Sequence, residues 1–252
     1  MKKEIQIFFN ALTFYTCIPC PRWITYSEEY SSRSTKYLPL IGWIVGGLSA
    51  LIFWGCTFIF PISVGIILSM IASILFTGAF HEDGLADVCD GFGGGHTKEK
   101  KLEIMKDSHI GAFGATGLIL ILFLKFSSLN EIYFRILPFA IIAAHSLSRF
   151  AAITMIRTHQ YVRGEDSKII FLSKKISSLD LVIAGLFGII PILLFQNIFY
   201  FILIVPVFIV RWILGIYFKK QIGGYTGDCL GATQQVCEVV FYISLLVLWK
   251  YI

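Results

Sequence analysis

Charged side chains are scarce in this sequence of 252 residues. Only 15% of the residues are Asp, Glu, Lys or Arg, while 56% are hydrophobic and the mean hydropathy is +0.77. Soluble domains usually carry about 25% charged residues, so the composition excludes an ordinary soluble domain. It indicates a protein whose helices lie in a membrane.

Motifs of several common binding sites are also missing. Cys17 and Cys20 form one Cys-x-x-Cys pair, but no second pair completes a zinc site. The glycine-rich residues 91–95 lack the Gly-Lys-Ser/Thr ending of a P-loop, which argues against a nucleotide hydrolase. No basic stripe predicts contact with nucleic acid. The net charge of +5 is better explained by membrane topology and by attraction to anionic lipid.

Long uncharged stretches predict about seven transmembrane helices. A bilayer core is crossed by roughly 20 apolar residues. Residues 37–80 contain no charged residue, which is enough for a helical hairpin with Pro61 at its turn. Further crossings are predicted at residues 109–126, 132–154, 181–196, 198–218 and 234–251. We therefore expect an all-α, polytopic membrane helical bundle that forms a single integral domain over residues 1–252.

The two ends of the bundle are predicted to differ in charge. Most of the 21 Lys and Arg residues fall on one face of this topology, and the short loops on the other face contain none. The positive-inside rule assigns the basic face of this multi-pass protein to the cytoplasm. The apolar N-terminal segment is interrupted by polar residues and prolines, and it predicts an additional helix at the membrane interface: "IQIFFNALTFYTCIPCP".

Four carboxylates follow the second predicted crossing directly. They are Glu82, Asp83, Asp87 and Asp90 in the segment "HEDGLADVCDGFGGG". If this segment is helical, the three aspartates occupy positions i, i+4 and i+7 and share one face. A divalent cation would relieve their repulsion, and oxygen ligands favour Mg²⁺, Ca²⁺ or Mn²⁺ over Zn²⁺. The alternative is a solvated loop whose acids pair with the lysines that follow.

A second polar segment precedes the last crossing. "KKQIGGYTGDCLGATQQVCE" places Asp228 among glycines and neutral hydrogen-bonding side chains. The glycines permit close approach of the backbone to a substrate or to another helix. Substrate binding and simple helix packing explain this segment equally well.

Two arginines lie inside predicted crossings. Arg149 and Arg211 each sit one to two turns from the predicted cytoplasmic end of a helix, where they can pair with an acid or hold a phosphate. A buried ion pair explains them as well as a phosphate contact does. Together, the acids and the arginines suggest metal-dependent handling of a phosphorylated substrate at the cytoplasmic side, without identifying that substrate.

Several segments of the sequence resemble the cobalamin synthase (adenosylcobinamide-GDP ribazoletransferase) family. The clearest are "HEDGLADVCDGFGGG", "LEIMKDSHIGAFGATG" and "GGYTGDCLGATQQVCE". The segments "NALTFYTCIPCP", "YLPLIGWIVGG" and "LSRFAAITMIRTHQYVRGEDSK" extend the similarity, in order, over nearly the whole chain. The resemblance implies the last assembly step of cobalamin biosynthesis, carried out in a prokaryotic inner membrane. In that step, a ribose hydroxyl of α-ribazole or its 5′-phosphate attacks the cobinamide-side phosphorus of adenosylcobinamide-GDP, and GMP is released. The resemblance also implies dependence on Mg²⁺.

This resemblance, combined with the spacing of the acids, suggests a role for each candidate residue. Asp83, Asp87 and Asp90 would hold Mg²⁺ against the diphosphate, with Glu82 binding the metal or supporting a ligand. Asp107 or Asp228 would position or deprotonate the attacking hydroxyl. The candidate substrate contacts are Glu82, Lys106, Arg149, Arg163, Gly224, Thr226, Gly227 and Gln234.

Two other functions are compatible with acids at a membrane boundary. A CDP-alcohol phosphotransferase also uses spaced aspartates, but its Asp-x-x-Asp-Gly-x-x-Ala-Arg pattern is not present here. A cation transporter would spread its polar residues toward both membrane faces, whereas these gather at one. The expected partners are adenosylcobinamide-GDP, α-ribazole and membrane lipids, with other late cobalamin-assembly enzymes or a second copy of the chain as further candidates.

Overall fold

The computed structural model describes residues 2–25, 27–163 and 174–250. Within these ranges the regular structure is helical, apart from one isolated parallel bridge between Tyr161 and Tyr225. The prediction of an all-α fold is confirmed.

In the part of the chain that the structure describes, six helices are long and apolar enough to cross a membrane, and a pair of helices bent between Thr77 and Phe80 raises the number to seven if it counts as one span. This agrees with the predicted number of crossings. The segments involved are α3 (Leu38–Cys56), α4 (Ile62–Thr77), α7 (Ala112–Glu131), α8 (Leu137–Thr158), α9 (Ser178–Ile189) with η3 (Ile190–Phe195), η4 (Ile198–Leu203) with α10 (Ile204–Ile222), and α11 (Gly227–Trp249).

Prolines and capping residues explain where several of these helices begin. Pro61 precedes α4, and Pro138 lies in the first turn of α8, where a missing backbone N–H costs nothing. The Asn197 side chain accepts a hydrogen bond from the backbone N–H of Phe199 and so starts η4. The predicted turn of the hairpin at Pro61 is therefore confirmed.

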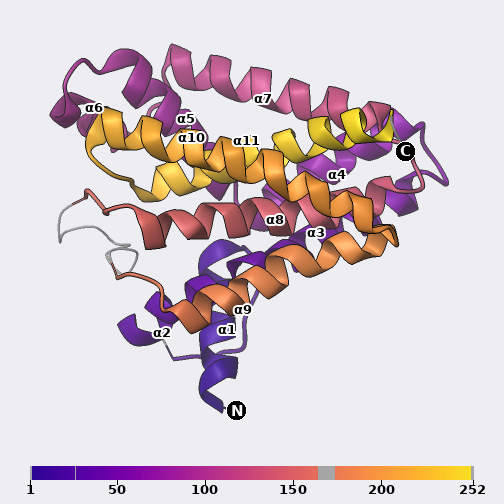
Figure 1. The fold of residues 1–252 in the computed structure, drawn as a ribbon, viewed down its shortest axis with the longest axis horizontal. Coiled ribbons are helices and arrows are strands. Elements are labelled where there is room, and N and C mark those ends of the chain that lie inside the picture. The colour runs from indigo at the N-terminus through magenta and orange to yellow at the C-terminus, as the bar shows by residue number, and fades with distance from the viewer. Residues whose placement is uncertain (1, 26, 164–173, 251–252) are drawn as a thin grey trace.

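The shorter helices lie toward one end or one side of the bundle. Helix α1 (Lys2–Tyr15) is the predicted N-terminal helix, and it runs across the direction of the long helices (Figure 1). After α4, Gly78 and Ala79 adopt left-handed conformations with φ of 61° and 57°, and the chain bends by 87° into α5 (Phe80–Gly94). The remaining short helices are α2 (Glu28–Ser34), η1 (Thr35–Tyr37) and α6 (Lys98–Ile104).

Helix α8 occupies the centre of the bundle and is buried along most of its length. A Cβ on Gly42 of α3 would lie 2.6 Å from the backbone oxygen of His145, so the two helices are in backbone contact there. Small residues allow this close packing, on which helix association in a membrane depends. Large apolar side chains such as Leu51 and Ile119 are exposed on the outside, as expected of a surface that faces lipid.

The polar segments collect at one end of the bundle, which we call the polar end. It contains α5, α6, the last turns of α8 and α10, and the first turn of α11 (Figure 1). The loops at the opposite end, around Pro61 and Asn197, are short. The bend after α4 therefore brings the acidic segment beside residues that are more than 100 positions away in sequence.

Candidate active site

Asp83, Asp87 and Asp228 form an acidic group at the polar end. The residues from Asp83 to Asp90 are helical, as the spacing required. A Cβ on Gly84 would lie 3.0 Å from Cα of Asp228, so α5 packs directly on the first turn of α11 and brings this aspartate beside the other two. Asp83 is exposed and Asp87 is half-buried, so the group remains open to a ligand.

The carboxylates of this group repel one another. The pKa of Asp87, on α5 beyond the bend, is raised to about 7 by burial and then by the negative charges of Asp228 and Asp83. Both causes disfavour the ionised form. The acidic group is therefore under electrostatic strain that a bound cation would relieve.

One arginine already compensates part of this charge. Nη2 of Arg163 lies 2.5 Å from Oδ2 of Asp228 and also donates a hydrogen bond of 2.9 Å to the backbone oxygen of Met105. Thr226 caps α11 and donates its hydroxyl to the same carboxylate at 3.2 Å. The predicted substrate contacts Arg163 and Thr226 therefore lie at the acidic group. Arg163 lies in the segment "LSRFAAITMIRTHQYVRGEDSK", and residues 164–168 of that segment lie outside the described residues.

Asp90 makes a different contact from the one its spacing suggested. Its Oδ2 accepts a hydrogen bond from the backbone N–H of Gly111 at 2.7 Å, and its Oδ1 accepts one from Gly114 at 2.8 Å. An anion at this position satisfies N–H groups that a helix start leaves unpaired. A Cβ on Gly114 would lie only 2.2 Å from Oδ2, so the contact requires glycine. Asp90 shares the predicted face of α5, but it anchors the start of α7.

A preformed metal cage is absent from residues 2–25, 27–163 and 174–250, because no three His, Cys, Asp or Glu side chains among them are grouped closely enough to hold an ion. The donor chemistry nevertheless fits a hard cation, since Asp83 and Asp87 offer carboxylate oxygens in a crowded negative field. Mg²⁺ typically binds through one or two carboxylates plus substrate phosphates rather than in an all-protein cage.

Glu82 faces the interior of the bundle instead of the acidic group. Its Oε1 accepts a hydrogen bond of 2.9 Å from Nε2 of Gln235, while its Oε2 is buried without a hydrogen-bond partner among the described residues. Gln235 also donates to Gln234, whose Nε2 donates to Glu238 at 2.6 Å. Gln234, a predicted substrate contact, thus lies in a chain of hydrogen bonds that runs from α5 into the membrane-spanning region.

This chain ends in a buried charged network. Lys125 of α7 lies 2.6 Å from Glu238 of α11, and Nε2 of His145 lies 3.5 Å from the same carboxylate. Arg149 approaches both the ring and the backbone oxygen of His145 at 2.9 Å and is only 1% exposed. The predicted phosphate contact Arg149 is therefore placed in this network rather than at the acidic group.

Lys125 and His145 were not among the residues predicted from the sequence. Their position in the sequence could have identified them as candidates. Each is an ionisable residue inside a predicted crossing, and such residues are usually functional or paired. The partners could not be assigned, since Lys125 and Glu238 are far apart in sequence and lie on different helices.

Lys106 and Asp107 lie on the exposed loop that follows α6. Asp107 accepts hydrogen bonds from the ring of His109 at 2.7 Å and from its backbone N–H at 3.0 Å. The hydrogen bond from the ring lowers the pKa of Asp107. Neither residue contacts the acidic group through a described hydrogen bond or ion pair.

Gly224 and Gly227 are buried where α10 connects to α11. A Cβ on Gly224 would lie 2.0 Å from the backbone oxygen of Gln160, which also accepts the N–H of Tyr225 at 2.9 Å. Gly224 thus allows two segments to run side by side next to the acidic group. Gly227 is the first residue of α11.

Comparison with known proteins decides the family. The family described as cobalamin-5-phosphate synthase matches residues 7–246. The chain belongs to this family. The matched residues of this cobalamin-5-phosphate synthase family include the acidic group, the buried network and Gly224.

Similar proteins of known name support the same assignment. An adenosylcobinamide-GDP ribazoletransferase of Shewanella frigidimarina is 43% identical over 250 residues, which cover 97% of this chain and 95% of that protein. One of Shewanella amazonensis is 44% identical, with 99% and 98% covered. One of Ralstonia pickettii is 41% identical, with 99% and 96% covered. No solved structure matches this chain.

Proposed function

We propose that this chain is an adenosylcobinamide-GDP ribazoletransferase, which joins α-ribazole or its 5′-phosphate to adenosylcobinamide-GDP and releases GMP. The proposal is supported by relatives of that name that are 41% to 44% identical over nearly their whole length. The single structural observation that carries it is the acidic group at the polar end of the helical bundle, where the charges of Asp83 and Asp228 act on Asp87.

The reaction is a transfer at phosphorus. A ribose hydroxyl oxygen forms a bond to the cobinamide-side phosphorus, and the bond from that phosphorus to the bridging oxygen of the diphosphate breaks. GMP leaves with the electron pair, and the hydroxyl gives up its proton. Enzymes assist such transfers mainly by positioning the reactants and by neutralising charge.

Asp83 and Asp87 are the residues that would hold Mg²⁺ beside the diphosphate. When bound there, Mg²⁺ would neutralise charge on the diphosphate oxygens. Asp83 is exposed, and the carboxylate of Asp87 is crowded by its neighbours, so both are suited to accept a cation. Asp90 would contribute by holding α7 against α5, since both of its oxygens accept backbone N–H groups.

Asp228 is better placed than Asp107 to orient the attacking hydroxyl and take its proton. Asp228 lies in the acidic group, whereas Asp107 is exposed and hydrogen-bonded to His109. Arg163 contacts Asp228, and its Nε has no hydrogen-bond partner among the described residues, so its guanidinium can also donate to a diphosphate oxygen. Lys106 would reach the substrate from the exposed loop that follows α6.

We further propose that the chain forms one integral domain and that its polar end faces the cytoplasm from the inner membrane. The support is the distribution of charge, because the segments at the polar end carry most of the lysines and arginines, whereas Arg135 is the only one in the described loops at the opposite end. In this orientation the water-soluble substrates reach the acidic group without crossing the bilayer.

The test is a reaction in lipid nanodiscs containing the purified protein. Adenosylcobinamide-GDP, α-ribazole and Mg²⁺ are supplied, and release of GMP is measured together with formation of the joined product. We expect turnover by the native chain and a loss of at least about 10²-fold for Asp83→Asn. Glu103→Gln is the matched control, because Glu103 is an exposed acid on α6 outside the acidic group. Absence of GMP release by folded protein, or near-normal turnover by Asp83→Asn, contradicts the proposal.

A further inference from the structure

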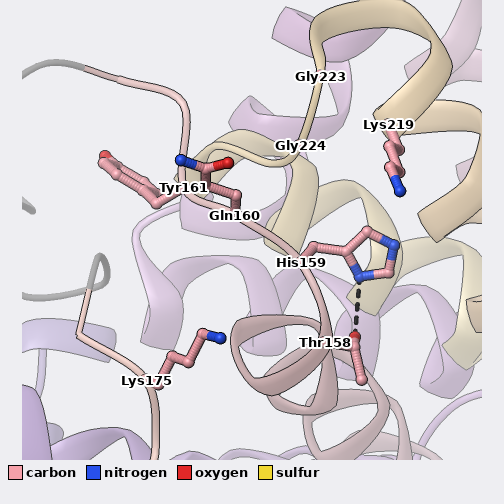
Figure 2. Close-up of a pocket in the computed structure, with 8 residues that line it drawn as sticks. All are labelled: Thr158, His159, Gln160, Tyr161, Lys175, Lys219, Gly223 and Gly224. Atoms are coloured by element: carbon pink, nitrogen blue, oxygen red, sulfur yellow. Dashed lines mark hydrogen bonds between the residues drawn. The ribbon is translucent and has the colours of Figure 1, made fainter.

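An apolar groove lies on the outside of the bundle, near the end opposite to the polar end. It is formed by the second half of α3 and by the residues at which α8 begins, and its volume is about 720 Å³. Ligand sites in proteins usually measure about 300–1,000 Å³. The pocket in which Figure 2 shows His159 and Lys219 lies at the polar end and is a separate space.

Small residues create this groove. Helices α3 and α8 are in contact at Gly46, where a Cβ would lie 3.0 Å from Cα of Ile142. One residue later, a Cβ on Gly47 would meet nothing within 4 Å, and Gly47 lines the groove together with Ala50. From Gly47 to Trp54, which also lines the groove, the helix rises roughly 10 Å. The groove therefore runs from the interior of the membrane toward its surface.

Aromatic side chains place the outer end of the groove at the membrane surface. Trp54 lines this end and is 44% exposed. Tyr133 and Trp249 stack at the same end of the bundle, with their ring centroids 6.1 Å apart. Trp and Tyr are enriched at the level of the lipid head groups. A lipid whose head group lies at this level can extend an acyl chain into the groove.

Arg135 carries the only charge among the described residues that line the groove. Its side chain is exposed, and its Cζ lies 5.8 Å from the centroid of the Phe134 ring. Within the described ranges Arg135 forms no ion pair, and Glu131, the acid next to it in the sequence, forms none either. The guanidinium of Arg135 is thus available to an anion at the membrane surface.

We propose that this groove binds an anionic phospholipid of the leaflet at the opposite end. The lipid phosphate pairs with the planar guanidinium of Arg135, and one acyl chain fills the hollow beside Gly47 and Ala50. A zwitterionic lipid binds less well, because no carboxylate among the described lining residues can accept its ammonium group. The proposal does not depend on the proposed reaction, whose residues lie at the polar end.

The test measures which lipid lies beside Trp54. The protein is placed in phosphatidylcholine nanodiscs that contain a small fraction of a lipid with brominated acyl chains, either phosphatidylglycerol or phosphatidylcholine. Bromine quenches tryptophan fluorescence on contact, and subtraction of the signal from Trp54→Phe isolates the contribution of Trp54. The ratio of the quenching by the two brominated lipids gives the lipid preference at the groove.

Two pairs of variants separate the groove from its surroundings. Arg135→Gln removes the cation of the groove, whereas Lys250→Gln removes an exposed cation at the same end of the bundle that does not line it. Gly47→Leu fills the groove, whereas Gly55→Leu adds the same side chain to α3 outside it. Nothing lies within 4 Å of a Cβ at either glycine, so both leucine variants should fold.

We expect Trp54 of the native chain to prefer phosphatidylglycerol at least about fivefold, the size of one contact between a basic residue and an anionic lipid surface. Arg135→Gln should abolish this preference, and Lys250→Gln should keep it. Gly47→Leu should also abolish it, because the acyl chain can no longer enter the groove. Gly55→Leu should behave like the native chain.

Three results would overturn the proposal. The first is equal quenching of Trp54 by both lipids in the native chain. The second is the same loss of preference in Arg135→Gln and Lys250→Gln, because the lipid then responds to the charge of this membrane face as a whole. The third is that neither lipid quenches Trp54, which would mean that protein, such as a second copy of the chain, covers the groove. If Gly47→Leu does not fold, Gly47→Val is compared with Gly55→Val in the same way.

Discussion

Lys125 and Glu238 form an ion pair in the interior of the helical bundle, with Nζ of the lysine 2.6 Å from Oε1 of the glutamate. The two side chains are only 4% and 0% exposed. The carboxylate also accepts hydrogen bonds from Gln234 and Tyr242, so its charge is compensated by several donors at once. Through Gln234 and Gln235 this pair is connected to Glu82, beside the acidic group.

Removing the lysine should destabilise the protein strongly. Lys125→Met leaves the buried carboxylate of Glu238 without its cation, and breaking a buried pair costs about 3–5 kcal/mol. We expect a drop of this size in the free energy of unfolding, measured by denaturant titration in mixed micelles. Lys220→Met is the control, because Lys220 is exposed and should change stability by less than about 0.5 kcal/mol. Equal stability of the two variants would show that the pair is not maintained.

The contact of Asp90 with the start of α7 can be tested separately from catalysis. Asp90→Ala removes the acceptor of two backbone N–H groups, which should destabilise the first turn by about 1–2 kcal/mol. Amide hydrogen exchange at residues 111–115 should accelerate about tenfold. Asp107→Ala is the control, since its hydrogen bonds go to His109. Unchanged exchange in Asp90→Ala would argue against the anchoring role.

Gly224 should tolerate no side chain. Gly224→Ala places a Cβ 2.0 Å from the backbone oxygen of Gln160 and must push the two paired segments apart. We expect GMP release to fall at least about tenfold, with the fluorescence-monitored melting temperature lowered. Gly47→Ala is the matched control, because nothing lies within 4 Å of a Cβ at Gly47 and alanine suits a helix. If Gly224→Ala were as active as Gly47→Ala, close pairing of the segments would not be needed.

Metal binding should depend on the exposed part of the acidic group. Mn²⁺ binding, followed by electron paramagnetic resonance with substrate diphosphate present, should weaken about 10- to 100-fold in Asp83→Asn and in Asp87→Asn. Glu103→Gln should bind Mn²⁺ like the native chain. Chelation with EDTA should stop GMP release, and added Mg²⁺ should restore it. Normal Mn²⁺ affinity in both aspartate variants would remove these residues from the metal site.

The general architecture followed from the amino-acid sequence. The uncharged stretch at residues 37–80 had to form a membrane hairpin, because the bilayer leaves no other way to satisfy the backbone. Pro61 marked the turn of this hairpin, and the structure retains it. The shared face of Asp83 and Asp87 followed from helix geometry alone, since residues four apart lie one above the other.

Contacts between distant segments did not follow from the sequence. Asp90 has the same spacing as its neighbours, yet the path of the chain back to Gly111 gives it two backbone donors instead of an open face. Arg149 was equally suited to a phosphate and to a buried partner, and the packing of α8 in the centre of the bundle placed it beside His145.

Composition and periodicity by themselves determined that this protein is a membrane bundle of helices with acids at one end, because those properties depend on the length and spacing of nearby residues. The pairing of Lys125 with Glu238, the approach of Asp228 to α5 and the contact of Gly224 with Gln160 were decided by how the helices pack. Each of these joins segments far apart in the chain, and local spacing carries no information about which of them will meet.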